Sequence, residues 1–357
     1  MRILILGGNF NNTGGTERVG SMLANGLSEA GYEIVLASLL CGDKPFFPLS
    51  KKIEVVSLFD KSGRTLHRTP SIIYKIRKLL KKENIDTIIA VETMLVFFTL
   101  PATLGLLINH ICWEHFNFNN NSGKKGRPIA RQLAARYCDS VVTLTERDKE
   151  YWLKGTRHKS QIVAIANPCP FPVQEYVKKE DTKIVLAVGR LTHIKGFDML
   201  LEAWIKVNTV MPDWKLKIVG EGDSRAELTE FIKNNNLTGS VELVGNTNNV
   251  SDYYKEAEIF CLSSRFEGFG MVLIEALAFG LPIVSFDCDT GPAEVLKDTG
   301  SILVPQNNIT QLASSLIELM NDGQRRKETS IKSKEKAEIY QPDNIIKQWI
   351  ALLESFN

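Results

Sequence analysis

The sequence predicts an α/β protein with two doubly wound domains, each built on a parallel β-sheet that helices cover on both faces. Three observations support this prediction. The chain has 357 residues, which is long for one hydrophobic core. Strand-like and helix-like segments alternate along it. A break with three prolines, residues 167–172, separates two such series, and neither a helix nor a central strand can continue through it.

The first series of strand-like segments fills the N-terminal half of the chain. Residues 94–111 are its longest apolar stretch, but polar residues, a proline and a glycine interrupt them, so we interpret them as a buried helix followed by a strand. The first residues are likewise interpreted as a strand and not as a signal peptide. Between most strands lie helical patterns, as at residues 16–30. The predicted strands are residues 2–7, 32–39, 53–57, 87–91, 107–113 and 140–144.

The second series repeats this rhythm after the proline break. Helical patterns at residues 196–207 and 224–234 alternate with apolar runs, and an apolar stripe at helical spacing closes the chain. We therefore expect one domain at 1–167, joined by the tail 341–357, and a second at 182–338. The predicted strands of the second domain are residues 184–188, 215–219, 241–244, 259–262 and 282–286.

Cysteine usage and charge limit the class of protein. The six cysteines are scattered without a C-x-x-C pair, which indicates a reduced, cytoplasmic protein without disulfides or a zinc site. Residues 1–170 hold 23 Lys and Arg against 14 Asp and Glu, whereas the remainder holds 20 against 27. The basic helix at 75–82 suits an anionic membrane surface or, equally well, is a solvated helix face. No aromatic residues interleave this run, so nucleic acid is not expected.

A glycine pair opens the first predicted helix directly after the first strand, at residues 14–18 (GGTER). Glycine lets a ligand approach the backbone closely, and the N–H groups at a helix start attract phosphate. The spacing does not match G-x-G-x-x-G, so the pattern does not favour a dinucleotide. A plain strand-to-helix turn remains the alternative.

Two cations follow the first strand of the second domain. Arg190 and Lys195 lie five residues apart in the loop 189–196, where they are placed to hold both phosphates of a diphosphate. The alternative is two unrelated surface cations. Because parallel sheets bind ligands beyond the carboxyl ends of their strands, the position favours the binding function.

Two carboxylates follow the strand at 259–262. Glu267 falls in the loop, and Glu275 lies within a helix that begins near Gly270. A helix start supplies N–H donors for a diphosphate, while the carboxylates can accept hydrogen bonds from the hydroxyls of a sugar and a ribose. Residues 289–294 form another strand-to-helix turn on the same sheet edge. Together these segments indicate a polyhydroxylated ligand that carries a diphosphate.

These segments resemble glycosyltransferase family 4, whose retaining enzymes have the GT-B fold: two Rossmann-like domains face each other across a cleft, and the C-terminal helix crosses back to domain one. The most specific element is Glu267-x7-Glu275 after Arg190 and Lys195. The resemblance implies that the two cations bind the donor diphosphate, that Glu267 contacts the donor sugar and that Glu275 binds the ribose. The wider donor site that it implies comprises Gly15, Val244, Asn246, Gly268, Phe269, Gly270, Met271, Val272 and Leu273.

The acceptor side of the site is placed on the first domain. His115 follows a domain-one strand, and members of the family that resemble this chain have a His near the transferred sugar. His115 therefore joins Glu267, Arg190 and Lys195 as a catalytic residue, with a structural His in the loop as the alternative. Glu114 and Thr16 are further candidates for acceptor binding.

The resemblance implies transfer of a hexose or N-acetylhexosamine from a nucleotide diphosphate sugar to a hydroxyl of a lipid-linked or growing surface glycan. UDP is the preferred nucleotide because residues 289–294 are similar to those of capsule, exopolysaccharide and lipid-linked oligosaccharide enzymes. Cations and helix starts supply the positive charge, so no cofactor or metal is expected. We expect a cytoplasmic protein, peripheral on the cytoplasmic face of the inner membrane.

Three alternatives to a glycosyltransferase can be stated. A GT-B sugar-nucleotide epimerase shares the fold and is the closest alternative. An oxidoreductase requires a dinucleotide fingerprint, which the sequence lacks. A non-enzymatic binding protein of this fold should lack one of the cation or carboxylate positions, and none is lacking.

Overall fold

The computed structural model describes residues 1–60, 68–175 and 181–356. The chain divides into two compact units: unit 1 contains Met1–Pro168 and Pro342–Asn357, and unit 2 contains Cys169–Gln341. The division falls inside the proline-rich break. The C-terminal helix α13 (Pro342–Glu354) belongs to unit 1, so the chain returns to its first domain as the resemblance implied.

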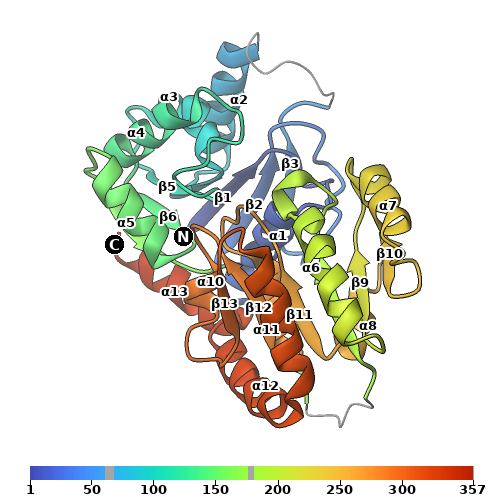
Figure 1. Cartoon of the computed structure of the whole chain (residues 1–357). Helices are drawn as coiled ribbons and strands as arrows, with labels where there is room; N and C mark the ends of the chain where they lie inside the picture. The colour runs from blue at the N-terminus through green and yellow to red at the C-terminus, as the bar shows by residue number, and fades with distance from the viewer. Residues whose placement is uncertain (61–67, 176–180, 357) are drawn as a thin grey trace. The chain divides into compact units, whose positions relative to one another are not determined.

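Unit 1 is built on a seven-stranded sheet in the order β3-β2-β1-β4-β5-β6-β7, in which every neighbouring pair is parallel (Figure 1). All five residues of β4 are buried, because helices cover both faces of such a sheet. The strand order reverses between β1 and β4. The strands are β1 (Arg2–Gly7), β2 (Glu33–Ser38), β3 (Glu54–Ser57), β4 (Thr87–Val91), β5 (Asn109–Trp113), β6 (Ser140–Thr143) and β7 (Gln161–Ala164).

Helix α13 packs against the first helix of unit 1. A Cβ at Gly26 would lie 2.5 Å from the side chain of Ile346, so the glycine lets the two helices approach closely. The Trp349 ring lies 4.9 Å from that of Trp113, at the end of β5. In the described part of unit 1 the helices are α1 (Gly15–Glu29), α2 (Thr69–Lys82), η2 (Thr93–Leu95), α3 (Val96–Thr103), α4 (Arg127–Tyr137), α5 (Glu146–Gly155) and α13.

Helix α2 contains the basic run of the sequence. Its apolar residues Ile76, Leu79 and Leu80 are buried in the core of unit 1. Lys78 and Lys81 are exposed on its other side. The structure therefore shows a solvated basic face whose apolar side is already occupied by the protein core.

Unit 2 is built on a six-stranded parallel sheet in the order β10-β9-β8-β11-β12-β13. Its order reverses between β8 and β11, so both units share one topology. The fold class predicted from the alternating segments is confirmed. The strands are β8 (Ile184–Val188), β9 (Lys215–Val219), β10 (Val241–Gly245), β11 (Ile259–Leu262), β12 (Ile283–Asp287) and β13 (Ile302–Pro305).

The helices α6 and α11 lie side by side against the sheet of unit 2 (Figure 1) and contribute to one buried core that includes Trp204 and Leu316. The indole N–H of Trp204 donates to the hydroxyl of Ser240 at 3.3 Å. The helices of unit 2 are η3 (His193–Lys195), α6 (Phe197–Val210), α7 (Arg225–Asn234), α8 (Val250–Glu256), α9 (Met271–Ala278), α10 (Pro292–Val295), α11 (Ile309–Asn321) and α12 (Gly323–Glu338).

The sequence prediction missed two strands, β7 and β13. Both have four residues and lie at the last position of their sheet, and β13 ends at Pro305. Such short edge strands show little periodicity. The apolar stretch 94–111 is confirmed as helix followed by strand, since it forms η2, α3 and the start of β5.

Candidate active site

Two loops of unit 2 meet at the carboxyl edge of its sheet, where the strand order reverses. One follows β8 (residues 189–196) and the other follows β11 (residues 263–270). Gly196 has φ 64°, and a Cβ there would lie 2.0 Å from the carbonyl oxygen of Ser263, so glycine is required for this contact. The Ser263 hydroxyl donates to the Lys195 carbonyl at 3.0 Å, and the Arg265 N–H donates to the Ile194 carbonyl at 2.8 Å. The two loops are thus joined by one backbone hydrogen bond, one side-chain hydrogen bond and a close backbone contact.

This joining brings Lys195 and Glu267 together. The Lys195 ammonium lies 2.7 Å from Glu267 Oε1, and the Ser264 hydroxyl donates to the same oxygen at 2.6 Å. The Lys195 side chain is 23 % exposed and that of Glu267 is 9 % exposed. An ammonium has three protons, so Lys195 can bind a phosphate oxygen while it keeps its bond to Glu267.

Arg190 lies on the same loop as Lys195. It is exposed, and its guanidinium forms no hydrogen bond or ion pair with the described parts of the chain. Its guanidinium can therefore bind an incoming anion through two parallel hydrogen bonds.

The start of helix α9 supplies N–H groups beside this cluster. Gly270 precedes the helix with φ 87°, and the Leu273 N–H donates to the Gly270 carbonyl at 2.8 Å. The N–H groups of Met271 and Val272 have no acceptor within the helix. Leu273 belongs to the donor site that the resemblance implies, but its N–H is already used inside the helix. The N–H groups of Met271 and Val272 remain as donors for a ligand.

The turn after β12 supports the loop that contains Glu267. The Thr290 hydroxyl donates to the carbonyls of Glu267 at 2.9 Å and Gly268 at 3.2 Å. Gly291 has φ 100°, and a Cβ there would lie 2.2 Å from the Phe269 carbonyl oxygen. The side chain of Phe269 is buried, so this residue can meet a ligand only through its backbone.

Glu275 is the fifth residue of α9 and is 7 % exposed. The hydroxyl of Tyr254, from helix α8, donates to Glu275 Oε2 at 2.8 Å. The Tyr254 ring is fully buried and stacks on Phe279 with centroids 5.2 Å apart. Because packing fixes this ring, its hydroxyl fixes the Glu275 carboxylate as well.

The remaining expected donor residues lie at strand ends or helix starts. Val244 and Asn246 flank Gly245, the last residue of the edge strand β10, and Asn246 is exposed. In unit 1, α1 begins at Gly15 and Thr16 follows it. A Cβ at Gly15 would meet no atom within 4 Å, so the backbone at this helix start is open to a ligand.

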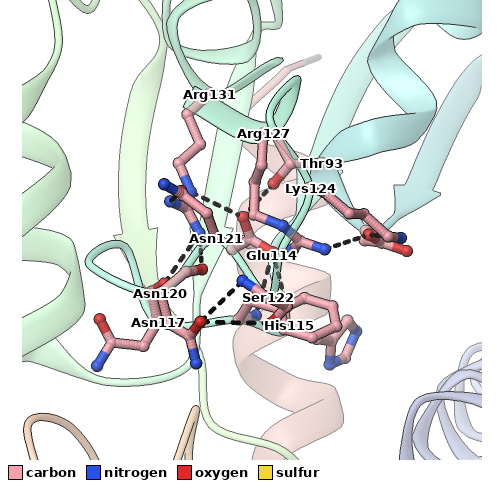
Figure 2. Close-up of polar contacts among 12 residues, drawn as sticks. Thr93, Glu114, His115, Asn117, Asn120, Asn121, Ser122, Lys124, Arg127 and Arg131 are labelled. Carbon is pink, nitrogen blue, oxygen red and sulfur yellow. Dashed lines mark hydrogen bonds and ion pairs between the residues drawn. The ribbon is translucent and has the colours of Figure 1, made fainter. Parts of the chain in front are cut away.

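A buried network of charged residues surrounds Glu114 at the end of β5 in unit 1. Figure 2 shows its carboxylate between the guanidinium groups of Arg127 and Arg131. Oε1 accepts the backbone N–H groups of His115 and Phe116, each at 3.1 Å. Oε2 accepts the Thr93 hydroxyl and the Arg131 Nε, the latter at 3.3 Å. The Glu114 side chain is fully buried, so the direct acceptor contact expected of it is not what this geometry favours.

His115 follows Glu114 and is only half-buried as a residue. Its ring lies 4.4 Å from that of Trp113. Its Nε2 has no hydrogen-bond partner among the described residues, and burial lowers the pKa of His115 to about 3. The imidazole is therefore neutral near pH 7 and able to exchange a hydrogen bond with a ligand.

The sequence analysis missed several residues that hold these groups in place. Arg127 and Arg131 lie four residues apart on the buried face of α4, which they share with Ala130 and Ala134. Two cations on an otherwise small and apolar helix face were a usable signal, because they need a buried carboxylate nearby. Ser264 and Tyr254 gave no such signal.

Metal and membrane features were searched in the described ranges. They contain no group of three or more His, Cys, Asp or Glu side chains arranged to hold a metal ion. A D-x-D triplet, Asp287-Cys288-Asp289, does begin at the last residue of β12, and the prediction of a metal-free reaction overlooks it. All six cysteines are free. No helix in these ranges has the length and hydropathy needed to cross a bilayer.

Models of two glycosyltransferase families match the two halves of the chain: "Glycosyltransferase Family 4" matches residues 13–170 and "Glycosyl transferases group 1" matches residues 172–336. An uncharacterized glycosyltransferase of Haemophilus influenzae is 38 % identical over 97 % of this chain and 98 % of its own length. The chain belongs to glycosyltransferase family 4. This glycosyltransferase is also 32 % identical to the amylovoran biosynthesis glycosyltransferase AmsD of Erwinia amylovora, over 99 % of each chain.

Two further similarities come from a sequence relative and a solved structure. A Campylobacter jejuni α-1,4-N-acetyl-D-galactosaminyltransferase, named for an acceptor linked to undecaprenol by a diphosphate, is 29 % identical over 96 % of this glycosyltransferase and 95 % of its own length. The structure of Anabaena HepE in complex with UDP and glucose superposes with a TM-score of 0.82 and 17 % identity, over 99 % of this chain and all of that one. The fold of this glycosyltransferase is thus the GT-B fold.

Proposed function

We propose that this glycosyltransferase moves a hexose or N-acetylhexosamine, with retention of configuration, from a UDP-sugar to a hydroxyl of a lipid-linked or growing surface glycan. The observation that carries the proposal is the Lys195–Glu267 pair beside the exposed Arg190, at the carboxyl ends of β8 and β11. The cations suit a diphosphate, and the carboxylate suits sugar hydroxyls.

In the proposed reaction the bond between the anomeric carbon and the diphosphate oxygen breaks. Arg190, Lys195 and the N–H groups of Met271 and Val272 stabilise the negative charge that develops on the diphosphate. The acceptor oxygen bonds to the anomeric carbon from the same face, and its proton passes to the departing diphosphate. Glu267 holds the sugar in this route. A covalent intermediate on an enzyme carboxylate is the alternative route to retention.

The choice of donor and acceptor draws on the relatives. UDP and glucose are bound in the HepE structure, and the Campylobacter relative is named for a diphospho-undecaprenol acceptor. The Erwinia relative is named for biosynthesis of a polysaccharide, amylovoran. These names favour a UDP-sugar and a lipid-linked or surface glycan here, with neutral His115 and Thr16 on the acceptor side. They give no support to the epimerase alternative.

The proposed reaction needs no metal, because Arg190, Lys195 and the α9 start place positive charge where the diphosphate would lie. Asp287 and Asp289 are the residues to test against this proposal. Transfer should be unchanged by EDTA, and it should survive replacement of both Asp by Asn. A requirement for Mg²⁺ or Mn²⁺ that the double variant abolishes would reverse the proposal.

We place the enzyme at the cytoplasmic face of the inner membrane, held by charge alone. The apolar side of α2 is buried in the core, so exposed cations such as Lys78 and Lys81 are the groups proposed to meet anionic lipids. Binding to vesicles with anionic lipid should fall as salt rises and after K78E/K81E. Binding to neutral vesicles, or binding that the variant leaves unchanged, would contradict this mode of attachment.

The decisive test of the proposal is a thermal-shift panel of UDP, GDP, ADP and CDP with their common sugars. Stabilisation grows with ligand concentration over its dissociation constant, so UDP and one UDP-sugar should give the largest shifts. Arg190→Ala should remove the shift, and Lys206→Ala, an exposed cation on α6, should keep it. A flat panel would refute the donor site. Incubation with the UDP-sugar alone should yield no epimer.

A further inference from the structure

The loop between β5 and α4, residues 114–126, is long and without regular secondary structure. Segments of this length in a compact domain are usually either functional or disordered. Here one side chain holds it: the Arg131 guanidinium is 2 % exposed and bonds to the loop at several points. Its partners are the carbonyls of Asn117 (2.9 Å), Asn120 (3.0 Å) and Phe118, and the side chains of Asn121 (3.1 Å) and Glu114 (3.3 Å).

Glu114 sets the backbone at the start of this loop. One of its oxygens accepts two successive N–H groups, those of His115 and Phe116, at 3.1 Å each. Two such bonds to one buried oxygen restrict the dihedral angles of His115, so they fix the direction in which its side chain leaves the backbone. Figure 2 shows the His115 ring turned away from the charged residues that hold its backbone.

A second set of contacts holds this loop from the end of the neighbouring strand β4. Glu92, directly after β4, has φ 93°, which is costly for a residue other than glycine. Its Oε1 accepts Arg127 at 2.7 Å and Lys124 at 3.1 Å. Arg127 in turn reaches Glu114 at 3.5 Å and stacks over the Phe116 ring at 3.8 Å. The charges therefore alternate from Lys124 to Arg131 and hold both strand ends and the loop.

Stability alone is a weak explanation for this network. Replacing a buried ion pair by apolar residues of similar volume is often neutral or stabilising, because the charges lose their hydration. Here three fully or almost fully buried charged side chains hold the loop in which His115 lies. The ring nitrogen Nε2 of His115 is itself enclosed and has no partner among the described residues. The network lies at the sheet edge where ligands of this fold class bind.

We propose that Glu114 and Arg131 are positioning residues that hold the β5–α4 loop so that His115 meets the acceptor. The inference rests on the proposed function, because it assigns His115 to the acceptor side. Neither residue touches substrate in this proposal. Their effect on transfer passes through the orientation of His115.

The test compares Glu114→Gln and Arg131→Lys with the wild type and with Glu150→Gln, a matched change in an exposed ion pair of α5. The first readout is the ¹³C-labelled ring resonance of His115, assigned with His115→Gln. Both network variants should shift this resonance, and the control should not. An unchanged resonance in a folded variant would overturn the proposal.

The second readout is kinetic and uses UDP-N-acetylglucosamine with a polyprenyl-diphosphate-linked N-acetylhexosamine as the probe acceptor. Acceptor-dependent turnover should fall at least about tenfold in Glu114→Gln, because small misplacements of a reacting group are costly. Affinity for UDP should stay within about twofold, since the proposed UDP site lies on unit 2 and neither variant alters that unit. Unchanged turnover would mean that the network is only structural. Because Glu114 and Arg131 act through the same loop, turnover of the double variant should be no lower than that of the slower single variant.

Failure of the proposed function gives a different pattern. If the wild type does not bind UDP or transfers to no acceptor, the function is refuted while the His115 resonances still test the positioning claim. If Glu114→Gln does not fold, Arg131→Lys keeps the buried positive charge and carries the same two readouts.

Discussion

The two units place charged residues at the same edge of the same sheet topology but use them differently. In unit 2, Arg190 is exposed and the Lys195 side chain keeps 23 % exposure beside Glu267. In unit 1, Glu114 and Arg127 have side chains with no exposure, and Arg131 is 2 % exposed. The first set of charges remains available to a ligand, whereas the second holds a loop. In our proposal, one fold thus provides binding charge in one unit and positioning charge in the other.

Removing a cation from unit 2 should have the largest effect on activity. Arg190→Ala or Lys195→Ala should lower turnover about 10²–10³-fold, since each removes charge stabilisation from the leaving diphosphate. Steady-state transfer rates measure this, with circular dichroism to establish that the fold is intact. Lys206→Ala should behave as wild type. Near wild-type turnover in both site variants would mean that the exposed cations of unit 2 serve another purpose.

Variants of the unit 1 network should lose more stability than variants of the unit 2 cations, which is the reverse of their order in lost activity. Arg131→Met leaves the buried Glu114 short of a partner and should cost about 3–5 kcal/mol. Lys195→Met breaks a partly exposed pair and should cost about 1 kcal/mol or less. Urea unfolding followed by tryptophan fluorescence gives both values. Equal losses would remove the distinction between a buried and an accessible network.

The hydroxyl of Tyr254 offers a sharper test of the donor side. Tyr254→Phe removes the hydroxyl that donates to Glu275 and keeps the stacked ring. Hydrogen bonds to charged groups contribute about 1.5–3 kcal/mol, so UDP affinity should fall about tenfold or more. Titration calorimetry with UDP and with 2′-deoxy-UDP separates the contribution of the ribose 2′-hydroxyl from the rest of the binding free energy. If Glu275 binds the ribose, the variant should lose less affinity for the deoxy ligand than for UDP.

The smallest expected effect is on acid stability and arises in unit 1. Burial lowers the pKa of His110 to about 4, and both its ring nitrogens lack partners among the described residues. The unfolded chain therefore binds more protons below pH 6.5, and this stability is present above that value and lost as pH falls toward 4. Through His110, the free energy of unfolding should fall by at most about 1.4 kcal/mol for each pH unit.

Urea unfolding at pH 7 and pH 5 measures this effect. His110→Leu should remove the part of the pH dependence that His110 contributes and leave the part due to His115, whereas His158→Gln, at an exposed position, should leave the pH dependence unchanged. A pH dependence as steep in His110→Leu as in the wild type would assign the acid sensitivity to another group.

The sequence by itself determined the two parallel sheets, the position of the domain boundary and the residues at the strand ends of unit 2. Apolar periodicity and the proline break are local signals, and Arg190, Lys195, Glu267 and Glu275 stand at fixed short spacings within loops and a helix start. Strand ends of a parallel sheet meet at one edge, so the chemistry of this edge can be inferred before the structure is known. The short edge strands β7 and β13 carried too little pattern to be found.

Only the tertiary structure decided how these side chains are paired. Contacts such as Lys195 with Glu267, Tyr254 with Glu275 and Arg131 with Glu114 join residues that lie 72, 21 and 17 positions apart. No periodicity links such residues, because packing of helices and loops onto the sheet determines their distance. The same packing encloses Glu114 and leaves Arg190 in solvent. Burial, which the sequence does not encode locally, therefore separates the charges that a ligand can reach from those enclosed by the protein.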